Sequence, residues 1–183
     1  MKILTFGEIM LRLKTPEYLR IVQANGFEAS YGGAESNVAV SLSTLGDDAA
    51  FLTKLPDNPV GNAAFNELRR YGVDTSRILR GGPRLGIYYF EKGNDIRPTS
   101  VLYDRAGSAL AKASATEFDW EALLSGIDIF FFSGVTPAIS PSVEQAVSNA
   151  LNYCHTHGIT VICDLNYRAK MWSREKAQSV MKN

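Results

Sequence analysis

The sequence predicts an α/β fold with a largely parallel central sheet. Two short apolar runs, 127–132 and 159–164, are typical of strands buried on both faces of such a sheet. Between them, residues 141–157 place apolar side chains at helical spacing, and a further helix is expected to begin near Ser173. The alternation of strands and helices indicates a parallel sheet covered by helices. The 183 residues, 45% hydrophobic and 21% charged, suit one soluble domain.

The first part of the chain supplies further elements of this alternation. Residues 2–6 are predicted to form the first strand. A helix is expected over 34–46, with Gly46 as a favourable C-terminal cap, and a strand over 49–55 follows it. The second helix is expected over 58–72, because proline is tolerated in a first turn and glycine ends a helix.

Two other segments resemble hairpins that stand outside the main sheet. Short β-like runs at 20–22 and 27–31 flank Asn25-Gly26, a dipeptide favoured in hairpin turns. Residues 85–91 and 100–105 are short, tyrosine-rich strands joined by a polar turn. The two hairpins are therefore expected to share one accessory sheet.

Charge and composition favour a small-molecule ligand. The 19 basic residues balance the 19 acidic ones and form no stripe, so neither nucleic acid nor a membrane surface is a predicted partner. The chain runs from Met1 directly into a strand without a long apolar segment, which predicts a cytoplasmic protein. Cys154 and Cys163 lack CxxC spacing and are expected to be small buried hydrophobic residues rather than a disulfide or zinc ligands.

The double glycine Gly32-Gly33 opens the first predicted helix and is a candidate ligand site. Glycine lets a ligand approach the main chain, and the first N–H groups of a helix are unpaired donors with a partial positive charge. Hydroxyl or anionic groups suit such a junction. A simple turn before a helix is the alternative.

Several familiar catalytic signatures are missing from the sequence. It contains no GxxxxGK[ST], GxGxxG, HExxH or GxSxG motif. His155 and His157, two apart on a helix, cannot face one ligand and are expected to be exposed. Asp164 is interpreted as ordering the end of its strand rather than as a catalytic base.

The helix that follows the double glycine carries a family resemblance. Gly32-Gly33-Ala34-Glu35-Ser36-Asn37-Val38-Ala39 is similar to the N-terminal signature of the PfkB, or ribokinase-like, carbohydrate kinases. Further segments follow in the family's order: Gly7–Met10, Gly72–Thr75, Ser133–Pro137, and Asp164–Arg168 with Trp172. The last two segments look most like those of members that phosphorylate 2-keto-3-deoxygluconate.

The resemblance implies a ribokinase-like three-layer sandwich that is incomplete in this chain. Residues 1–183 would form its N-terminal part, with a small β lid built from strands at about 12–31 and 85–105. The implied activity is ATP-dependent phosphorylation of a sugar acid, with ATP and Mg²⁺ bound by the complete enzyme. The family's catalytic base and nucleotide site are expected beyond Asn183, so no catalytic residue is assigned. Because phosphoryl transfer depends on these parts, the 183 residues alone are expected to be inactive.

A sugar-acid substrate needs a fixed cation for its carboxylate, and arginine offers a planar fork of donors. Arg105 and Arg168 are the candidates. Tyr103 shares a strand face with Arg105, and Tyr88 lies on the neighbouring predicted strand. Each alone suits an exposed sheet surface, and their combination favours a ligand site. The predicted substrate-binding residues are Gly32, Gly33, Tyr88, Tyr103, Arg105 and Arg168.

Three alternatives remain open from the sequence. The chain could belong to a fructokinase or another hexose kinase, although Arg12 replaces the aspartate of ribokinase-type members and argues against ribose or adenosine. It could be a non-catalytic sugar-binding or dimerisation module. A nicotinamide-dependent dehydrogenase is the third alternative, and it lacks its glycine fingerprint here. An exposed apolar side of a small lid predicts a two-fold, lid-to-lid homodimer.

Overall fold

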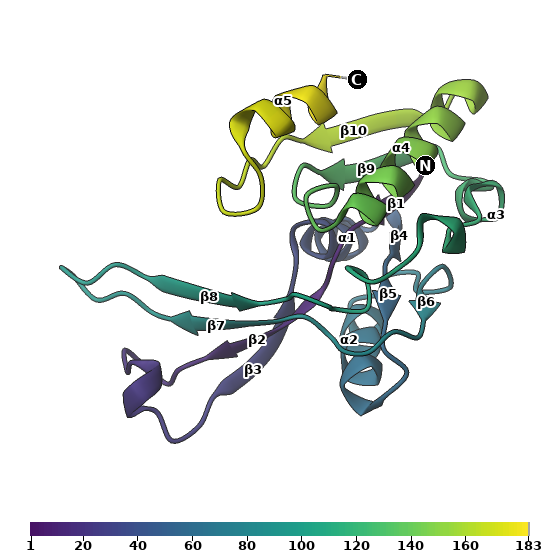
Figure 1. The fold of residues 1–183 in the computed structure, drawn as a ribbon. Coiled ribbons are helices and arrows are strands. Elements are labelled where there is room, and N and C mark those ends of the chain that lie inside the picture. The colour runs from purple at the N-terminus through teal and green to yellow at the C-terminus, as the bar shows by residue number, and fades with distance from the viewer. Residues whose placement is uncertain (183) are drawn as a thin grey trace.

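The computed structural model describes residues 1–182, which form a layered body and a projecting accessory sheet (Figure 1). The main sheet has the order β10-β9-β1-β4, and all its pairs are parallel. Its strands are β1 (Lys2–Phe6), β4 (Asp48–Leu52), β9 (Ile129–Ser133) and β10 (Thr160–Asp164). The predicted α/β class with a largely parallel sheet is confirmed.

Helices pack on both faces of the main sheet. They are α1 (Ala34–Leu45), α2 (Pro59–Arg70), α3 (Trp120–Leu124), α4 (Pro141–His157) and α5 (Arg174–Met181). The predictions of α1, α2, α4 and α5 are confirmed, while the short α3 was not predicted. Side-chain caps begin four of these helices, because Asn58, Asp119, Ser140 and Ser173 accept backbone N–H groups of the first turn.

Alternate residues of the strands supply two separate cores. Leu4 and Leu52 pack with α3 and α4, in a cluster that also contains Phe130. Phe51 points the other way and packs with Ala39 of α1 and residues of α2. This period of two is the geometry of a strand covered on both faces. The body is therefore helix, sheet and helix in three layers.

The accessory sheet has the order β3-β2-β7-β8. Its strands are β2 (Met10–Lys14), β3 (Glu28–Gly32), β7 (Ile87–Glu91) and β8 (Ser100–Asp104). Two antiparallel hairpins, β2 with β3 and β7 with β8, join through a parallel pairing of β2 with β7. The expectation that two hairpins share one sheet is met, and Figure 1 shows that sheet extending away from the main body.

The first hairpin has different strands from those predicted. Residues Ile21–Gln23 form a short 3-10 helix, η1, and the partner of β3 is β2. Hydrogen bonding explains the difference. The Ile21 N–H donates to Glu91 Oε1 at 2.7 Å, and the other backbone hydrogen bonds of the 3-10 helix are made within the segment itself. Asn25-Gly26 lies in the long connection between β2 and β3 and makes no hairpin turn.

Two further predictions need correction. The strand expected over 49–55 is interrupted, and its end is a separate strand β5 (Lys54–Leu55) that pairs with β6 (Leu79–Arg80). Within residues 1–182 the strand β10 is the last strand of the main sheet, and Val161 and Ile162 are 39% and 46% exposed there. A second short 3-10 helix, η2 (Ala115–Glu117), precedes α3.

The cysteines and histidines lie mostly where the sequence predicted. Cys154 is buried and Cys163 is partly buried, and burial raises the pKa of each thiol to about 11. His155 and His157 are exposed, and the His157 ring stacks on Tyr153. None of the helices within residues 1–182 has the length and apolar character needed to cross a bilayer.

Candidate substrate site

The double glycine lies where β3 of the accessory sheet meets the first turn of α1. Gly33 has an extended φ of −172°, which any residue can adopt. It must be glycine for another reason, because a Cβ there would lie 1.9 Å from the carbonyl oxygen of Glu8. A Cβ on Gly32 would lie 3.3 Å from the Tyr88 hydroxyl. Gly33 thus permits close backbone packing, whereas Gly32 faces a tyrosine of the predicted site.

A polar row crosses one face of the accessory sheet from β3 to β8. Ser30, Arg12, Tyr88 and Tyr103 are successive partners in the strand register, so their side chains share a face. Arg12 Nε donates to Ser30 Oγ at 2.8 Å, and the two tyrosine rings have centroids 5.7 Å apart. The structure therefore brings the two predicted tyrosines together. It adds Arg12 beside them, which the sequence had marked only as a departure from ribokinase-type members.

The environment of Tyr88 keeps its hydroxyl protonated. Burial raises the pKa of this half-buried phenol, and the nearby Arg12 guanidinium opposes that shift. A protonated tyrosine hydroxyl can both donate and accept a hydrogen bond. It is therefore suited to a sugar hydroxyl rather than to proton abstraction.

Arg105 lies just after β8 and is held by an acidic residue. Its Nη2 is 2.5 Å from Glu8 Oε2, and the Glu8 side chain is only 4% exposed. The other Glu8 oxygen, Oε1, accepts a hydrogen bond from Ser108 Oγ. Sequence reasoning missed this partner, although Glu8 stands in the Gly7–Met10 segment that carries part of the family resemblance.

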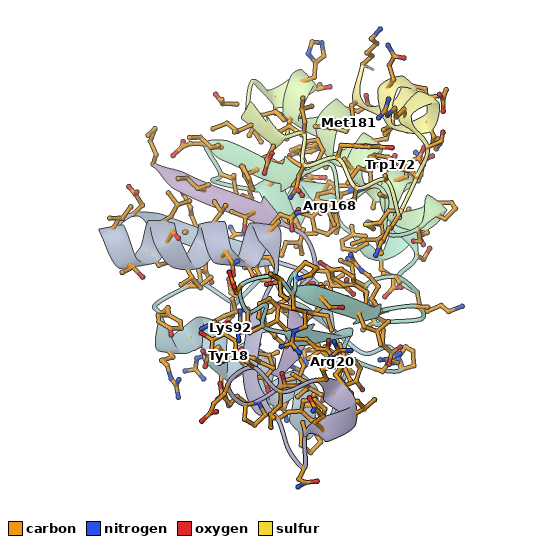
Figure 2. All side chains as sticks on the ribbon, turned by 90° about the vertical axis from the view of Figure 1, so that its left-hand side faces the viewer. Tyr18, Arg20, Lys92, Arg168, Trp172 and Met181 are labelled. Carbon is orange, nitrogen blue, oxygen red and sulfur yellow. The ribbon has the colours of Figure 1, made fainter. Side chains whose placement is uncertain are left out.

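Arg168 lies on the loop of residues 165–172, which follows β10. Figure 2 shows it on the side of the main body that faces the accessory sheet. The residue is exposed and forms no ion pair with any other residue in the range 1–182. The same loop reaches Arg105, because Met171 Sδ lies 3.7 Å from Arg105 Nη1. The two predicted arginines thus belong to segments that touch.

Asp164 orders the start of this loop. Its Oδ1 accepts the backbone N–H of Asn166 at 3.1 Å, and its backbone carbonyl accepts the N–H of Gly134 at 2.8 Å. Asn166 has a left-handed φ of 35°, so the turn after β10 is tight. The contacts agree with the interpretation of Asp164 as the residue that orders the end of its strand.

A buried carboxylate next to the glycine junction was also missed. Glu35, in the first turn of α1, is 1% exposed. Its Oε1 accepts hydrogen bonds from the backbone N–H of Ser133 at 3.0 Å, from Ser133 Oγ at 2.5 Å and from Thr136 Oγ1 at 2.8 Å. Gly7 leaves room for it, because a Cβ there would lie 2.1 Å from Glu35 Oε2. The residue ties α1 to the ends of β1 and β9.

Burial raises the pKa of Glu35, and the hydrogen bonds from Ser133 and Thr136 only partly oppose that shift. Folded protein therefore keeps the proton to a higher pH than the unfolded chain does. As the pH rises above the unfolded value of about 4.5, the folded state binds more protons and loses stability. Glu35→Gln removes this titration while keeping an acceptor oxygen.

We therefore expect the Glu35→Gln variant of the complete protein to gain stability relative to wild type as the pH rises from about 4.5 to 7. Urea unfolding midpoints measured across this range test the expectation. The exposed Glu121 offers a matched control, because Glu121→Gln makes the same replacement on a side chain that faces solvent. A Glu35→Gln variant with the pH slope of wild type would contradict the result.

Within residues 1–182 the structure points to no particular residues for ATP or Mg²⁺. No cluster of three or more histidine, cysteine, aspartate or glutamate side chains among them could hold a metal ion. A cavity of about 550 Å³ between α4, α5 and β10 is lined mostly by apolar side chains such as Leu151, Val161 and Met181. No residue of this part is therefore assigned to the nucleotide.

Comparisons with known proteins show the family of the chain. Residues 1–183 match the model of the pfkB family carbohydrate kinases. The crystal structure of 2-dehydro-3-deoxygluconokinase from Thermotoga maritima is 51% identical and superposes with a TM-score of 0.97, covering all of this chain and 56% of that one. The 2-dehydro-3-deoxygalactonokinase of Haloferax volcanii is 42% identical over 97% of this chain and 55% of its own length.

A third relative, the 5-dehydro-2-deoxygluconokinase of Clostridium tetani, is 30% identical over 93% of this chain and 50% of its own length. All three names describe kinases of deoxy sugar acids. The chain spans about half the length of the relatives it matches.

Proposed function

Because this chain belongs to the pfkB family of carbohydrate kinases, we propose that it carries the substrate-binding half of a sugar-acid kinase. The proposed reaction is transfer of a phosphoryl group from ATP to 2-keto-3-deoxygluconate, which gives the 6-phosphate. One observation carries the choice of an acid substrate. Arg105, beside the tyrosine face of the accessory sheet, contacts the loop that bears Arg168.

Each predicted residue has a role that its chemistry suits. Arg105 and Arg168 would hold the substrate carboxylate through charge-assisted hydrogen bonds. The hydroxyls of Tyr88 and Tyr103 would bond sugar hydroxyls, and Gly32 would let the sugar approach the main chain. ATP with Mg²⁺ would supply the phosphoryl group when bound by the rest of the complete enzyme.

The proposal is tested with the complete protein, Mg-ATP and a coupled assay for ADP. The panel is 2-keto-3-deoxygluconate, 2-keto-3-deoxygalactonate, 5-keto-2-deoxygluconate and the neutral sugar fructose. We expect kcat/KM to be highest for 2-keto-3-deoxygluconate and at least about tenfold lower for fructose, since an unpaired binding arginine costs more than about 1.4 kcal/mol. A preference for fructose would instead favour a hexose kinase. Absence of turnover with every sugar would favour a non-catalytic sugar-binding or dimerisation module.

We also propose that the complete protein forms a homodimer through the accessory sheet. The face opposite the tyrosines carries the register row Ala29, Leu13, Tyr89 and Leu102. Leu102 is 59% exposed, and Phe27 packs edge-on against Tyr89 with centroids 5.8 Å apart. An apolar sheet face of this kind is typical of a docking surface. Sedimentation as a monomer at micromolar concentration would contradict the dimer.

The cytoplasmic location stays a prediction.

A further inference from the structure

Glu8 occupies the point where the main body and the accessory sheet meet. It stands between the end of β1 and the start of β2, and it is 5% exposed. Its backbone carbonyl packs against Gly33, and its side chain packs against Gly86, where a Cβ would lie 3.0 Å from Glu8 Oε1. Because Gly86 lies directly against the carboxylate, its backbone leaves little space for the Glu8 side chain to move.

Both carboxylate oxygens of Glu8 are used by the segment that follows β8. Oε2 pairs with Arg105 Nη2, and Oε1 accepts from Ser108 Oγ. Ser108 Oγ in turn accepts the backbone N–H of Ala111 at 3.3 Å. The segment 105–111 is therefore fastened to Glu8 at two points.

The guanidinium of Arg105 keeps donors that this pairing does not use. Its Nε is buried and has no hydrogen-bond partner among residues 1–182. Its Nη1 has only the thioether of Met171, at 3.7 Å, and sulfur is a weak acceptor. Buried donors without partners are rare and costly, and a ligand that accepts hydrogen bonds there would remove the cost.

We propose that Glu8 is a positioning residue, which fixes the Arg105 guanidinium so that its Nη1 donors, on the side of the Met171 loop, face the carboxylate of the substrate. This inference rests on the proposed function, because it assumes an acid substrate. It assigns to Glu8 no contact with the reacting atoms.

The charges indicate that Glu8 acts through geometry. Glu8 cancels the positive charge of Arg105, so as a charge it weakens the attraction of the site for an anion. The positive charge of the site then comes from Arg168 and Arg12, neither of which has an ion pair within residues 1–182. What Glu8 adds is orientation, because a charge-assisted hydrogen bond from Arg105 to the substrate requires a guanidinium that is held in one direction.

Two conservative substitutions in the complete protein separate geometry from charge. Glu8→Asp keeps the charge but is one methylene too short to hold Arg105, whereas Glu8→Gln keeps the reach and an acceptor oxygen. We expect Glu8→Asp to raise the KM for 2-keto-3-deoxygluconate about tenfold, with kcat and the KM for fructose within about twofold of wild type. Glu8→Gln should raise the KM for the acid no more than about threefold.

A matched control removes a different carboxylate from a different arginine nearby. Asp104 pairs with Arg84 at 2.8 Å. Asp104 is next to Arg105 in the sequence, but it lies on the other face of the strand. Asp104→Asn should leave both KM values unchanged. The proposal is overturned if Glu8→Gln is more harmful than Glu8→Asp, if neither changes the KM for the acid, or if acid and neutral sugars lose equally.

A second measurement needs no turnover. In the complete protein with ¹⁵N-labelled arginine, a fixed Arg105 guanidinium should give two resolved Nη signals, because its rotation is slow. Glu8→Asp should merge them while the signals of Arg84 stay as they are. A single averaged Arg105 signal in wild type would overturn the role of Glu8. This readout is independent of whether the protein phosphorylates a sugar acid.

Discussion

Replacing Gly33 with alanine is expected to lower the free energy of unfolding by about 3 kcal/mol or more. The new Cβ would lie 1.9 Å from the Glu8 carbonyl oxygen, and backbone cannot rotate away as a side chain can. Such a loss lowers the Tm by several degrees. Thermal unfolding of the complete protein measures the change.

Gly26 provides the control for this substitution. A Cβ there meets nothing within 4 Å, and its φ is not in the left-handed region. Gly26→Ala should therefore change the stability by less than about 0.5 kcal/mol. If Gly33→Ala unfolds at the same temperature as Gly26→Ala, the close packing of β3 and α1 against Glu8 is wrong.

Arg168→Ala should weaken the capture of the acid sugar by roughly one to two orders of magnitude. A charge-assisted hydrogen bond to a carboxylate contributes about 1.5 to 3 kcal/mol, and this arginine has no other ion pair among residues 1–182 to lose. The kcat/KM for fructose should stay nearly unchanged. Steady-state kinetics of the complete enzyme with both sugars provide the comparison.

Arg105→Ala should reduce capture of the acid sugar to a similar degree, but it carries a second effect. It leaves the Glu8 carboxylate buried without its cation, and removing one partner of a buried pair costs about 3 to 5 kcal/mol of stability. Unfolding must therefore be measured alongside the kinetics. If acid and neutral sugars lose efficiency equally in Arg168→Ala, the carboxylate assignment is wrong.

Local patterns predicted most of the fold. The helical period of α4 and the apolar runs of β9 and β10 are properties of short segments, and each element formed where the pattern lay. The exposure of β10 was not predictable in the same way, because burial depends on which strands flank it. The partner of β3 was predicted wrongly. The tendency of Asn25-Gly26 to form a hairpin turn was outweighed by the pairing of β2, which pairs with β3 on one edge and with β7 on the other.

The site was predictable where it depends on strand geometry. Tyr88 and Tyr103 were expected on neighbouring strands, and the register pairs them directly. The partners of the charged groups were not predictable. Glu8 meets Arg105 across 97 positions of sequence, and Glu35 meets Ser133 across 98. Such contacts arise only when separate elements pack, so periodicity and spacing carry no sign of them.

The central place of β1 in the main sheet has a consequence for synthesis on the ribosome. β4 covers one edge of β1, but β9, which covers the other, begins 77 residues after β4 ends. At about 5 to 20 residues per second, roughly 4 to 16 s pass between the two. During that interval β1 has an unpaired apolar edge. Such an edge exposes the nascent chain to aggregation and is a natural point for chaperone binding.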